Sequence, residues 1–394
     1  MGQASSIERS VGGSSAKVPP PAIIRKQITP QLKIVTLARA GIEELFITAT
    51  PRNGGDSRRL IAEARRAARE TGAAIVAEDV FGVPAATASD DGVRPDWPTT
   101  WLDADRAASP ALAGVQVHAV KGVALDRIEQ DGRIVGSIFD DGLARHCRLG
   151  DLRPADRSAT PEHQARATFE LAERALRSAG MEFTDVVRTW FYLDRILDWY
   201  GPFNRVRDGF FRERRVFDGL VPVSTGIGGA NAARAALVAN VYAVQPRAGR
   251  ITIASVPSPL QRPALDYGSS FSRAVELALP DHRRLLISGT ASIDADGRTI
   301  HTGDPARQTD QTMNIVAAIL ESRGMGWSEV TRAVVYLKAG QSAQLFADWC
   351  AAHGQEQIPA VTTVNDICRE ELLFEIELDA VQGDSRRSIL DAHK

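Results

Sequence analysis

Two stretches of this sequence repeat one another at a distance of 144 residues. The first begins at Gln164 and the second at Gln308, and each reads as a long amphipathic helix, a Gly-Met turn and a strand. Identical residues at this offset include Gly180 and Gly324, Met181 and Met325, Arg188 and Arg332, and Tyr192 and Tyr336. A repeat of this length is too long for a solenoid, so it predicts two copies of one α+β domain.

The repeat continues at a shorter distance, because the segments around Pro222 and Pro359 align at an offset of 137. The helix between is therefore longer in the first copy. A weaker helix-then-strand pattern begins at Ser57 and predicts additional or degenerate pieces of the same design in the N-terminal region. We predict a flexible tail at 1–28, an N-terminal domain with extra elements at 29–248, a C-terminal catalytic domain at 249–384 and a tail at 385–394.

Charge and composition exclude several classes of partner. The net charge is −2 and no basic run is present, so neither nucleic acid nor a membrane surface is expected as a partner. No apolar run approaches the ~20 residues that a membrane-spanning helix needs. Three widely spaced cysteines fit a reducing compartment, and we predict a cytoplasmic protein. The histidines and cysteines lack metal-ligand spacing, so no metal site is expected.

The strand predicted at residues 372–381 carries acids on one face. Apolar residues occupy every second position, and the positions between them include Glu375, Glu377 and Asp379. One interpretation is a solvated sheet face, and the other is a functional carboxylate. In the first copy of the repeat, Val238 occupies the position of Glu375. This difference favours a single functional carboxylate in the second copy.

A run of small residues, Ser288–Ser292, ends another predicted strand and includes Gly289 and Ala291. Small side chains at a strand end allow a ligand to approach the backbone. The same run could equally form a β-bulge or a tight turn.

Other side chains have both a binding and a structural interpretation. Arg188 and Tyr192 share one face of a strand, where the guanidinium could bind a carboxylate or form a salt bridge in a polar domain interface. Tyr267 could orient a ligand through its hydroxyl, or it could be a half-buried core residue. Cys368, seven residues before Glu375, fits a small buried hydrophobe.

Residues 264–382 resemble the Rid (YjgF-like) family. The runs YGSSFSRAVEL, LLISGTASID, VTRAVVYL and FEIELDAV follow the order of that family's motifs. The resemblance implies tandem α+β domains of the Rid type, also described as chorismate-mutase-like, with mixed sheets, helices on one face and a pseudo-trimeric arrangement. The family's P-x-R pattern appears here as Pro359-Ala360-Val361, without the arginine that imine deamination needs.

Over residues 29–382 the chain is similar to the chorismatases, which carry two Rid-like halves in one polypeptide. The similar runs are VVRTWFYLDRILDWY, VPVSTGIGG, SPLQRPALDYGSSFSRAVE, SGTASI and CREELLFEIELDAV. The resemblance implies an enzyme that cleaves the enolpyruvyl ether of chorismate to pyruvate, with 3-hydroxybenzoate as the expected second product. The alternatives are a chorismate hydrolase giving a dihydroxycyclohexadienoate, an imine deaminase, or a non-catalytic metabolite-binding protein.

The resemblance also assigns roles to residues. Glu375 occupies the position of the catalytic acid, and Cys368 and Ala291 occupy positions linked to the choice of product. The residues expected to bind substrate are Arg188, Tyr192, Tyr267, Arg273 and Gly289. The implied partner is the small molecule chorismate, no metal or organic cofactor is needed, and the chain is expected to be a monomer or small homo-oligomer.

Overall fold

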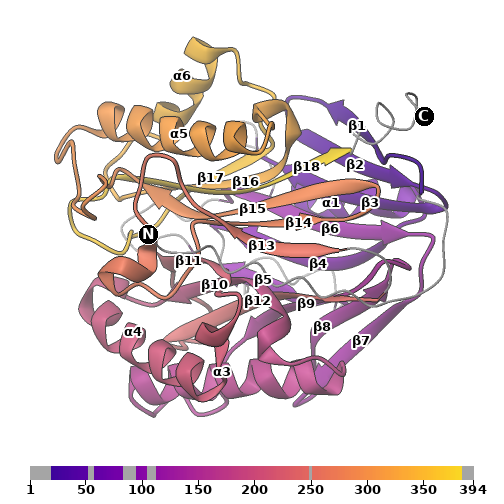
Figure 1. The fold of residues 1–394 in the computed structure, drawn as a ribbon, viewed down its shortest axis with the longest axis horizontal. Helices are drawn as coiled ribbons and strands as arrows, with labels where there is room; N and C mark the ends of the chain where they lie inside the picture. Colours follow the sequence, from indigo (N-terminus) through magenta and orange to yellow (C-terminus); the bar gives the residue numbers. More distant parts are fainter. Residues whose placement is uncertain (1–18, 52–56, 83–94, 104–111, 248–250, 384–394) are drawn as a thin grey trace.

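Three mixed β-sheets form the body of the molecule (Figure 1). The computed structural model describes residues 19–51, 57–82, 95–103, 112–247 and 251–383. Each sheet has six strands and follows one plan: three strands, a helix, a strand, an edge strand, and a last strand inserted between the third and fourth. The weak pattern that begins at Ser57 is therefore part of a complete third copy of the repeated unit. The predicted α+β class with mixed sheets is confirmed.

The first unit has the strand order β1-β2-β3-β6-β4-β5. Its elements are β1 (Ile23–Ile28), β2 (Leu32–Arg39), β3 (Ile42–Ala49), α1 (Ser57–Glu70), β4 (Ala74–Phe81), β5 (Thr99–Leu102) and β6 (Gly114–Lys121). Residues 23–28 belong to the tail predicted from the sequence, yet they form β1 because they pair along β2. The rest of the predicted N-terminal tail up to residue 18, and all of the predicted C-terminal tail, lie outside the described residues.

The second unit has the strand order β11-β10-β12-β9-β8-β7. Its strands are β7 (Leu125–Gln130), β8 (Arg133–Asp140), β9 (Ala144–Leu152), β10 (Val186–Leu193), β11 (Val223–Gly228) and β12 (Leu237–Pro246). Its helices are α3 (Pro161–Ser178) and α4 (Ile196–Glu213). These helices cover the lower face of the molecule in Figure 1.

The third unit has the strand order β13-β14-β15-β18-β16-β17. Its strands are β13 (Thr252–Val256), β14 (Ala274–Ala278), β15 (His282–Ala291), β16 (Val330–Leu337), β17 (Ala360–Val364) and β18 (Phe374–Gly383). Its helices are α5 (Pro305–Ser322) and α6 (Gln344–His353), at the top of Figure 1. Helix α4 has 18 residues and α6 has 10, and the loops beside them also differ in length. Residues 194–222 between β10 and β11 thus exceed residues 338–359 between β16 and β17 by seven, which is the change in offset within the repeat.

The long helices of the repeat begin in the same way. The side chain of Thr160 accepts a hydrogen bond from the backbone N–H of His163, and Asp304 does the same for Arg307. A proline follows each capping residue, where its missing N–H costs no helical hydrogen bond. Apolar residues on each helix then pack against one face of the sheet, so each unit has its own hydrophobic core.

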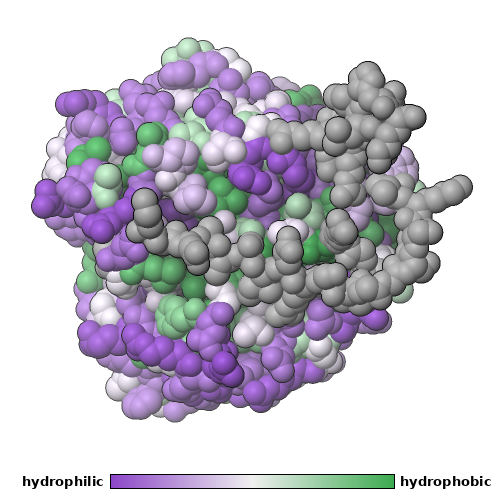
Figure 2. Space-filling model, in the orientation of Figure 1, coloured by the Kyte–Doolittle hydropathy of each residue, from purple (hydrophilic) through white to green (hydrophobic). Residues whose placement is uncertain are grey.

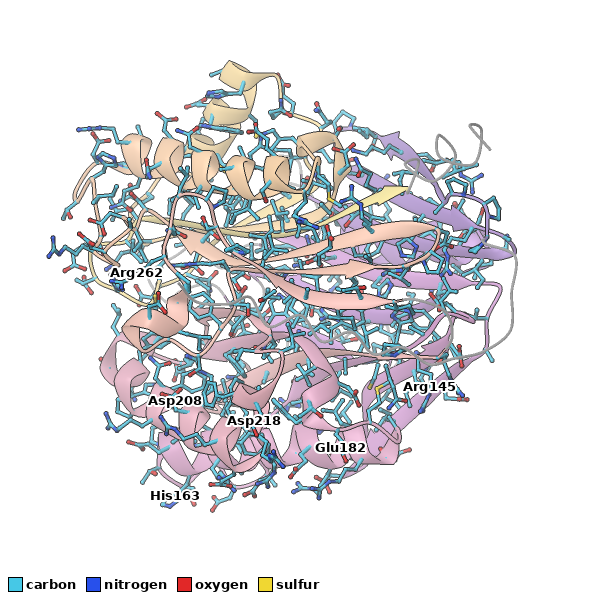
Figure 3. All side chains as sticks on the ribbon, in the orientation of Figure 1. Arg145, His163, Glu182, Asp208, Asp218 and Arg262 are labelled. Carbon is cyan, nitrogen blue, oxygen red and sulfur yellow. The ribbon has the colours of Figure 1, made fainter. Side chains whose placement is uncertain are left out.

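The outer surface over the helices is largely hydrophilic on the face shown in Figure 2, at its upper and lower edges. Exposed residues such as His163, Glu182 and Asp218 lie on this outer side of the second unit (Figure 3). Among the described residues, no helix combines the length and the apolar character needed to cross a bilayer.

Candidate active site

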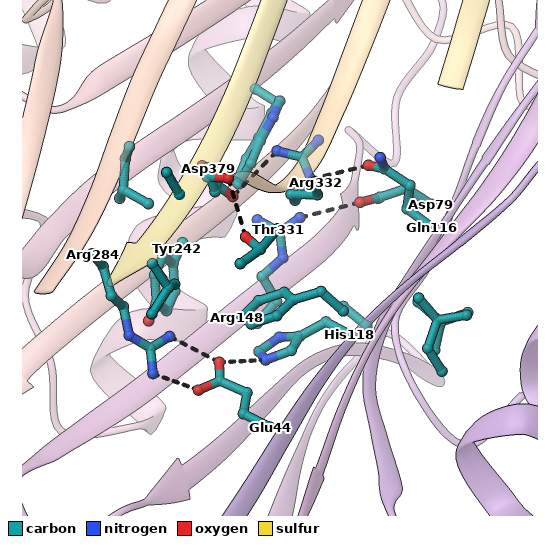
Figure 4. A pocket seen from close by; sticks show the side chains of 18 residues that line it. Glu44, Asp79, Gln116, His118, Arg148, Tyr242, Arg284, Thr331, Arg332 and Asp379 are labelled. Carbon is teal, nitrogen blue, oxygen red and sulfur yellow. Dashed lines mark hydrogen bonds and ion pairs between the residues drawn. The ribbon is translucent and has the colours of Figure 1, made fainter. Parts of the chain in front are cut away.

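A central cavity lies where the inner faces of the three sheets meet (Figure 4). It is rich in charged side chains, but they are paired across the units. Arg284 of β15 donates two hydrogen bonds to Glu44 of β3, and Arg148 of β9 donates to Asp79 of β4 at 3.1 Å. Among the described residues that line this cavity, each charged side chain has a partner of opposite charge, so these charges are not available to a ligand.

A second cavity is a cleft between the second and third units, and it encloses about 580 Å³ with its open mouth included. This volume lies in the range of small-molecule sites. The second unit contributes Tyr200, Arg207, Ser224 and Gly226. The third unit contributes Ser269, Phe271, Arg273, Gly289, Ala291, Ile293, Cys368, Arg369, Leu372 and Glu375. Five residues singled out in the sequence therefore meet here: Arg273, Gly289, Ala291, Cys368 and Glu375.

The acids of β18 differ in their surroundings. Phe374, Ile376 and Leu378 point into the core under α5, so Glu375, Glu377 and Asp379 share the opposite face. Arginines pair with two of these acids: Arg332 Nη2 lies 2.6 Å from Glu377 Oε1, and Arg188 Nη1 lies 2.7 Å from Asp379 Oδ1. Among the described residues, no arginine, lysine or hydrogen-bond donor contacts the carboxyl group of Glu375.

The pKa of Glu375 is raised to about 8, because burial removes water from the carboxyl group. Only 5% of the residue is exposed. Asp379 behaves in the opposite way. Burial alone would raise its pKa, but the guanidinium groups of Arg188 and Arg332 lower the pKa below its ordinary value. One strand thus holds a carboxyl group that is protonated at neutral pH and a carboxylate that is ionised.

Glycine at position 289 makes room for this carboxyl group. A Cβ atom on Gly289 would lie 2.1 Å from Glu375 Oε1, closer than any van der Waals contact allows. Ala291 lies directly across the ladder from Glu375. The β-bulge interpretation of the small-residue run is borne out, because the β15–β18 ladder shifts register between Ile287 and Thr290. At Gly289 the group that approaches the backbone is the side chain of Glu375.

Sequence reasoning missed Arg207, which lies on α4 and faces the cleft. It is 1% exposed, and neither Nε nor Nη2 finds a hydrogen-bond acceptor among the described residues. Burial lowers the pKa of its guanidinium below the ordinary value. The ring of Phe203 and the carboxylate of Asp208 lie near this guanidinium, but two buried nitrogens without an acceptor are costly, so they point to an anionic ligand. The sequence signal that could have indicated Arg207 is the extra length of α4. Tyr200 and Arg207 lie two turns apart on one face of this helix.

Two further guanidinium groups line the cleft and are held by backbone carbonyls. Arg273 Nε donates to Arg262 O at 3.2 Å, and Arg369 Nη1 donates to Gly297 O at 2.8 Å. With Arg207, the cleft has three positive charges, and its one acid, Glu375, is neutral at pH 7. The cleft is therefore suited to a ligand with more than one negative charge.

Cys368 lines the same cleft near Tyr200 and Glu375. The pKa of its thiol is raised to about 12, first by burial and then by the nearby carboxyl group of Glu375. The thiol is therefore neutral at physiological pH and unsuited to nucleophilic attack. Its contribution to the site is its small size and shape.

Two residues expected to bind substrate have other positions, and the side chain of a third is not described. Arg188 and Tyr192 do not line the cleft. Arg188 is fully buried and forms ion pairs with Glu377 and Asp379, as in the salt-bridge interpretation. Tyr192 packs in the apolar core between the units. Tyr267 ends a short 3-10 helix, Ala264–Tyr267, and its side chain lies outside the described residues.

Comparisons with known proteins agree with this architecture. A family model described as "Endoribonuclease L-PSP" matches residues 263–382. A chorismatase of Streptomyces hygroscopicus is 28% identical over 269 residues, which cover 62% of this chain and 76% of the relative. A chorismatase crystal structure superimposes with a TM-score of 0.62 at 18% identity, covering 85% of this chain and 98% of that chain. The chorismatase-like fold with Rid-type (L-PSP) domains, expected from the sequence, is confirmed.

Proposed function

We propose that this chorismatase-like protein cleaves the enolpyruvyl ether of chorismate, releasing pyruvate and 3-hydroxybenzoate, with Glu375 as the general acid. One observation carries the proposal: a buried carboxyl group with a raised pKa and no ionic partner faces a cleft that contains three arginines. A group that must give up a proton at neutral pH needs a pKa close to that pH. Glu375 meets this condition, whereas Asp379, whose pKa is lowered by Arg188 and Arg332, does not.

The charges of the cleft complement those of chorismate, which carries two carboxylates. Nε and Nη2 of Arg207 have no acceptor among the described residues, so a substrate carboxylate would supply the missing partner. Arg273 and Arg369 supply further positive charge on the opposite wall. We assign these three arginines to the binding of the two carboxylates.

The reaction begins with transfer of the Glu375 proton to the methylene carbon of the enol ether. The carbon–carbon double bond supplies the electron pair, and an oxocarbenium ion forms at the ether carbon. Glu375 becomes a carboxylate at this moment, and its negative charge stabilises the cation in a site that excludes most water. The arginines hold the carboxylates of the substrate in place during this step.

The oxocarbenium ion can react in two ways, and neither reaction needs a cofactor. If the neighbouring ring hydroxyl takes part, its oxygen bonds to the ring carbon that carried the ether, the ether bond breaks, pyruvate leaves, and the Glu375 carboxylate takes the hydroxyl proton. Opening of this epoxide at its other carbon and movement of a ring proton to the oxygen then give 3-hydroxybenzoate. If water adds instead, collapse of the adduct gives pyruvate and a dihydroxycyclohexadienoate. The small neutral side chains of Cys368 and Ala291 on the cleft wall limit where water can lie. We assign the choice between these products to these two residues.

The decisive experiment is an analysis of the products after the protein is incubated with chorismate. The proposal expects pyruvate in equal amount with 3-hydroxybenzoate, measured by chromatography. Pyruvate together with the diol would be consistent with Glu375 as the acid, but it would show that water, and not the ring hydroxyl, reacts with the cation. Absence of pyruvate would refute the proposal, and hydrolysis of an imine of 2-aminoacrylate would then point to the deaminase alternative.

A further inference from the structure

The connection between β13 and β14 differs from the two connections that correspond to it in the other units. Residues 29–31 join β1 to β2 and residues 131–132 join β7 to β8, whereas residues 257–273 separate β13 from β14. Antiparallel neighbours need only a two-residue turn. The extra length is therefore not required by the fold, and it occurs in the unit that carries Glu375. We call residues 257–273 the strap.

The strap crosses from the third unit to the second at the cleft. Ser269, Phe271 and Arg273 line the cleft. Between them, Ser270 Oγ donates a hydrogen bond of 2.5 Å to Asp208 Oδ1 on α4. Asp208 follows Arg207 in the chain, so this contact lies beside the unpaired guanidinium.

Both ends of the strap are held firmly. Near its start, Gln261 Nε2 donates to Ile293 O at 2.9 Å. Near its end, Ser272 N donates to Pro222 O at 3.0 Å, and Ser272 Oγ donates to Val221 O at 2.6 Å. These contacts tie the ends to backbone groups of the two units, which leaves the middle of the strap as the part that can move.

The middle of the strap is thinly attached. Arg262, Pro263, Leu265, Asp266 and Gly268 are exposed, and Leu265 exposes 47% of its surface. Gly268 has a φ of 81°, a left-handed conformation that glycine adopts without strain. Segments with few buried contacts open at low free energy. Arg262 on the strap and Asp208 on α4 lie on the same side of the molecule in Figure 3.

We propose that residues 262–270 form a lid over the cleft, latched by the hydrogen bond between Ser270 and Asp208. The strap forms part of the cleft wall, and Glu375 and Arg207 in the same cleft expose only 5% and 1% of their surfaces. Release of the latch lets the middle of the strap swing while Gln261 and Ser272 stay fixed. The proposal rests on the cleft being the ligand site of the proposed function.

The lid can be tested without the reaction, because Cys368 reports access to the cleft. The other cysteines, Cys147 and Cys350, lie in the separate cores of the second and third units. The probe is 4,4′-dithiodipyridine, and the labelled peptide is identified by mass spectrometry. We expect Ser270→Ala to label at Cys368 at least ~10-fold faster than the unmodified protein, the scale for losing a hydrogen bond to a charged acceptor. Asp266→Asn is the matched control, because the carboxylate of Asp266 faces Arg262 within the strap.

Equal labelling of Cys368 in Ser270→Ala and the unmodified protein would overturn the lid. Amide hydrogen exchange in the unmodified protein is a second readout. It tests the lid even if Ser270→Ala does not fold. The lid requires residues 262–270 to exchange faster than the neighbouring strand β14, and equal protection would contradict it. Neither measurement needs chorismate, so failure of the proposed function and failure of the lid are distinguishable.

Discussion

The carboxyl group of Glu375 lies against the backbone of Gly289, on the neighbouring strand β15, with no space for a side chain between them. This contact fixes the position of the carboxyl group over the floor of the cleft. It also explains why position 289 needs glycine, although its φ is not left-handed and its backbone conformation is open to other residues. The contact is one of packing, so it can be tested by adding a single methyl group.

Gly289→Ala is expected to lower kcat by about 100-fold, since a displacement of about 1 Å of a reacting group has an effect of this size. The added Cβ would overlap Glu375 Oε1 and push the carboxyl group away from the substrate. Gly226→Ala is the control, because its Cβ would meet Tyr200 at an ordinary 3.5 Å in the same cleft. Steady-state kinetics with chorismate compares the two. Equal activity of both variants would show that this contact does not position the acid.

Glu375→Gln is expected to bind chorismate but to release pyruvate at least ~100-fold more slowly, the usual scale for losing a general acid. In the unmodified protein, activity should fall as the pH rises through about 8, where Glu375 loses its proton. The exposed acid Glu371 provides the control variant Glu371→Gln. Turnover by Glu375→Gln at the unmodified rate would remove Glu375 from the mechanism.

Glu375 should also make the stability of the folded protein depend on pH. The pKa is about 8 in the folded protein and ~4.3 in the unfolded chain, so the unfolded chain binds fewer protons between these values. The free energy of unfolding should therefore fall as the pH rises from ~4.3 to 8, by up to ~5 kcal/mol relative to Glu375→Gln. Denaturant titrations of both proteins at pH 4 and pH 9 measure this. A constant difference between them would show that the pKa is not raised.

Arg207→Met is expected to raise KM for chorismate by at least ~10-fold, because a charge-assisted hydrogen bond to a carboxylate is lost. The same variant should be at least as stable as the unmodified protein, since it removes a buried guanidinium whose Nε and Nη2 have no acceptor among the described residues. Arg205→Met changes an exposed arginine on the same helix and should alter neither quantity. Isothermal calorimetry and thermal unfolding separate binding from stability. A destabilised Arg207→Met with unchanged KM would indicate a purely structural role.

Cys368→Val is expected to move the product mixture from 3-hydroxybenzoate towards the diol, while the release of pyruvate continues. The branched side chain would change the shape of the cleft wall beside Glu375, and with it the position of water around the cation. Chromatography of the products measures the ratio. An identical mixture from both proteins would exclude a role of Cys368 in product choice.

The candidate acid could be found from the sequence because two local signals coincide at it. Alternation along residues 372–381 places Glu375 opposite the core, and the internal repeat shows a valine at the corresponding position. Neither signal depends on knowing how the units are arranged. The fold class was predictable for the same reason, since helix and strand patterns are local. The first unit was harder to identify, because only its helix and one strand keep a visible pattern.

The binding residues were harder to predict, because the cleft is formed by two units. Arg207 is one of many arginines in the sequence, and only the packing of α4 against the third unit leaves its Nε and Nη2 without an acceptor among the described residues. Arg188 looked equally suitable as a ligand for a carboxylate. Its acidic partners, Glu377 and Asp379, lie about 190 residues away in the chain and become neighbours only when the sheets assemble.

The covalent joining of three similar units allows their mutual surfaces to diverge. In a ring of separate identical subunits, every substitution at a contact surface would occur three times, so the ring would keep either three working clefts or none. Here the counterpart of Glu375 in the second unit is Val238, and between the first and third units Gly114 accommodates the side chain of Val361. When the units are joined in one chain, one contact surface can thus be used for catalysis, while the other contact surfaces only hold the units together.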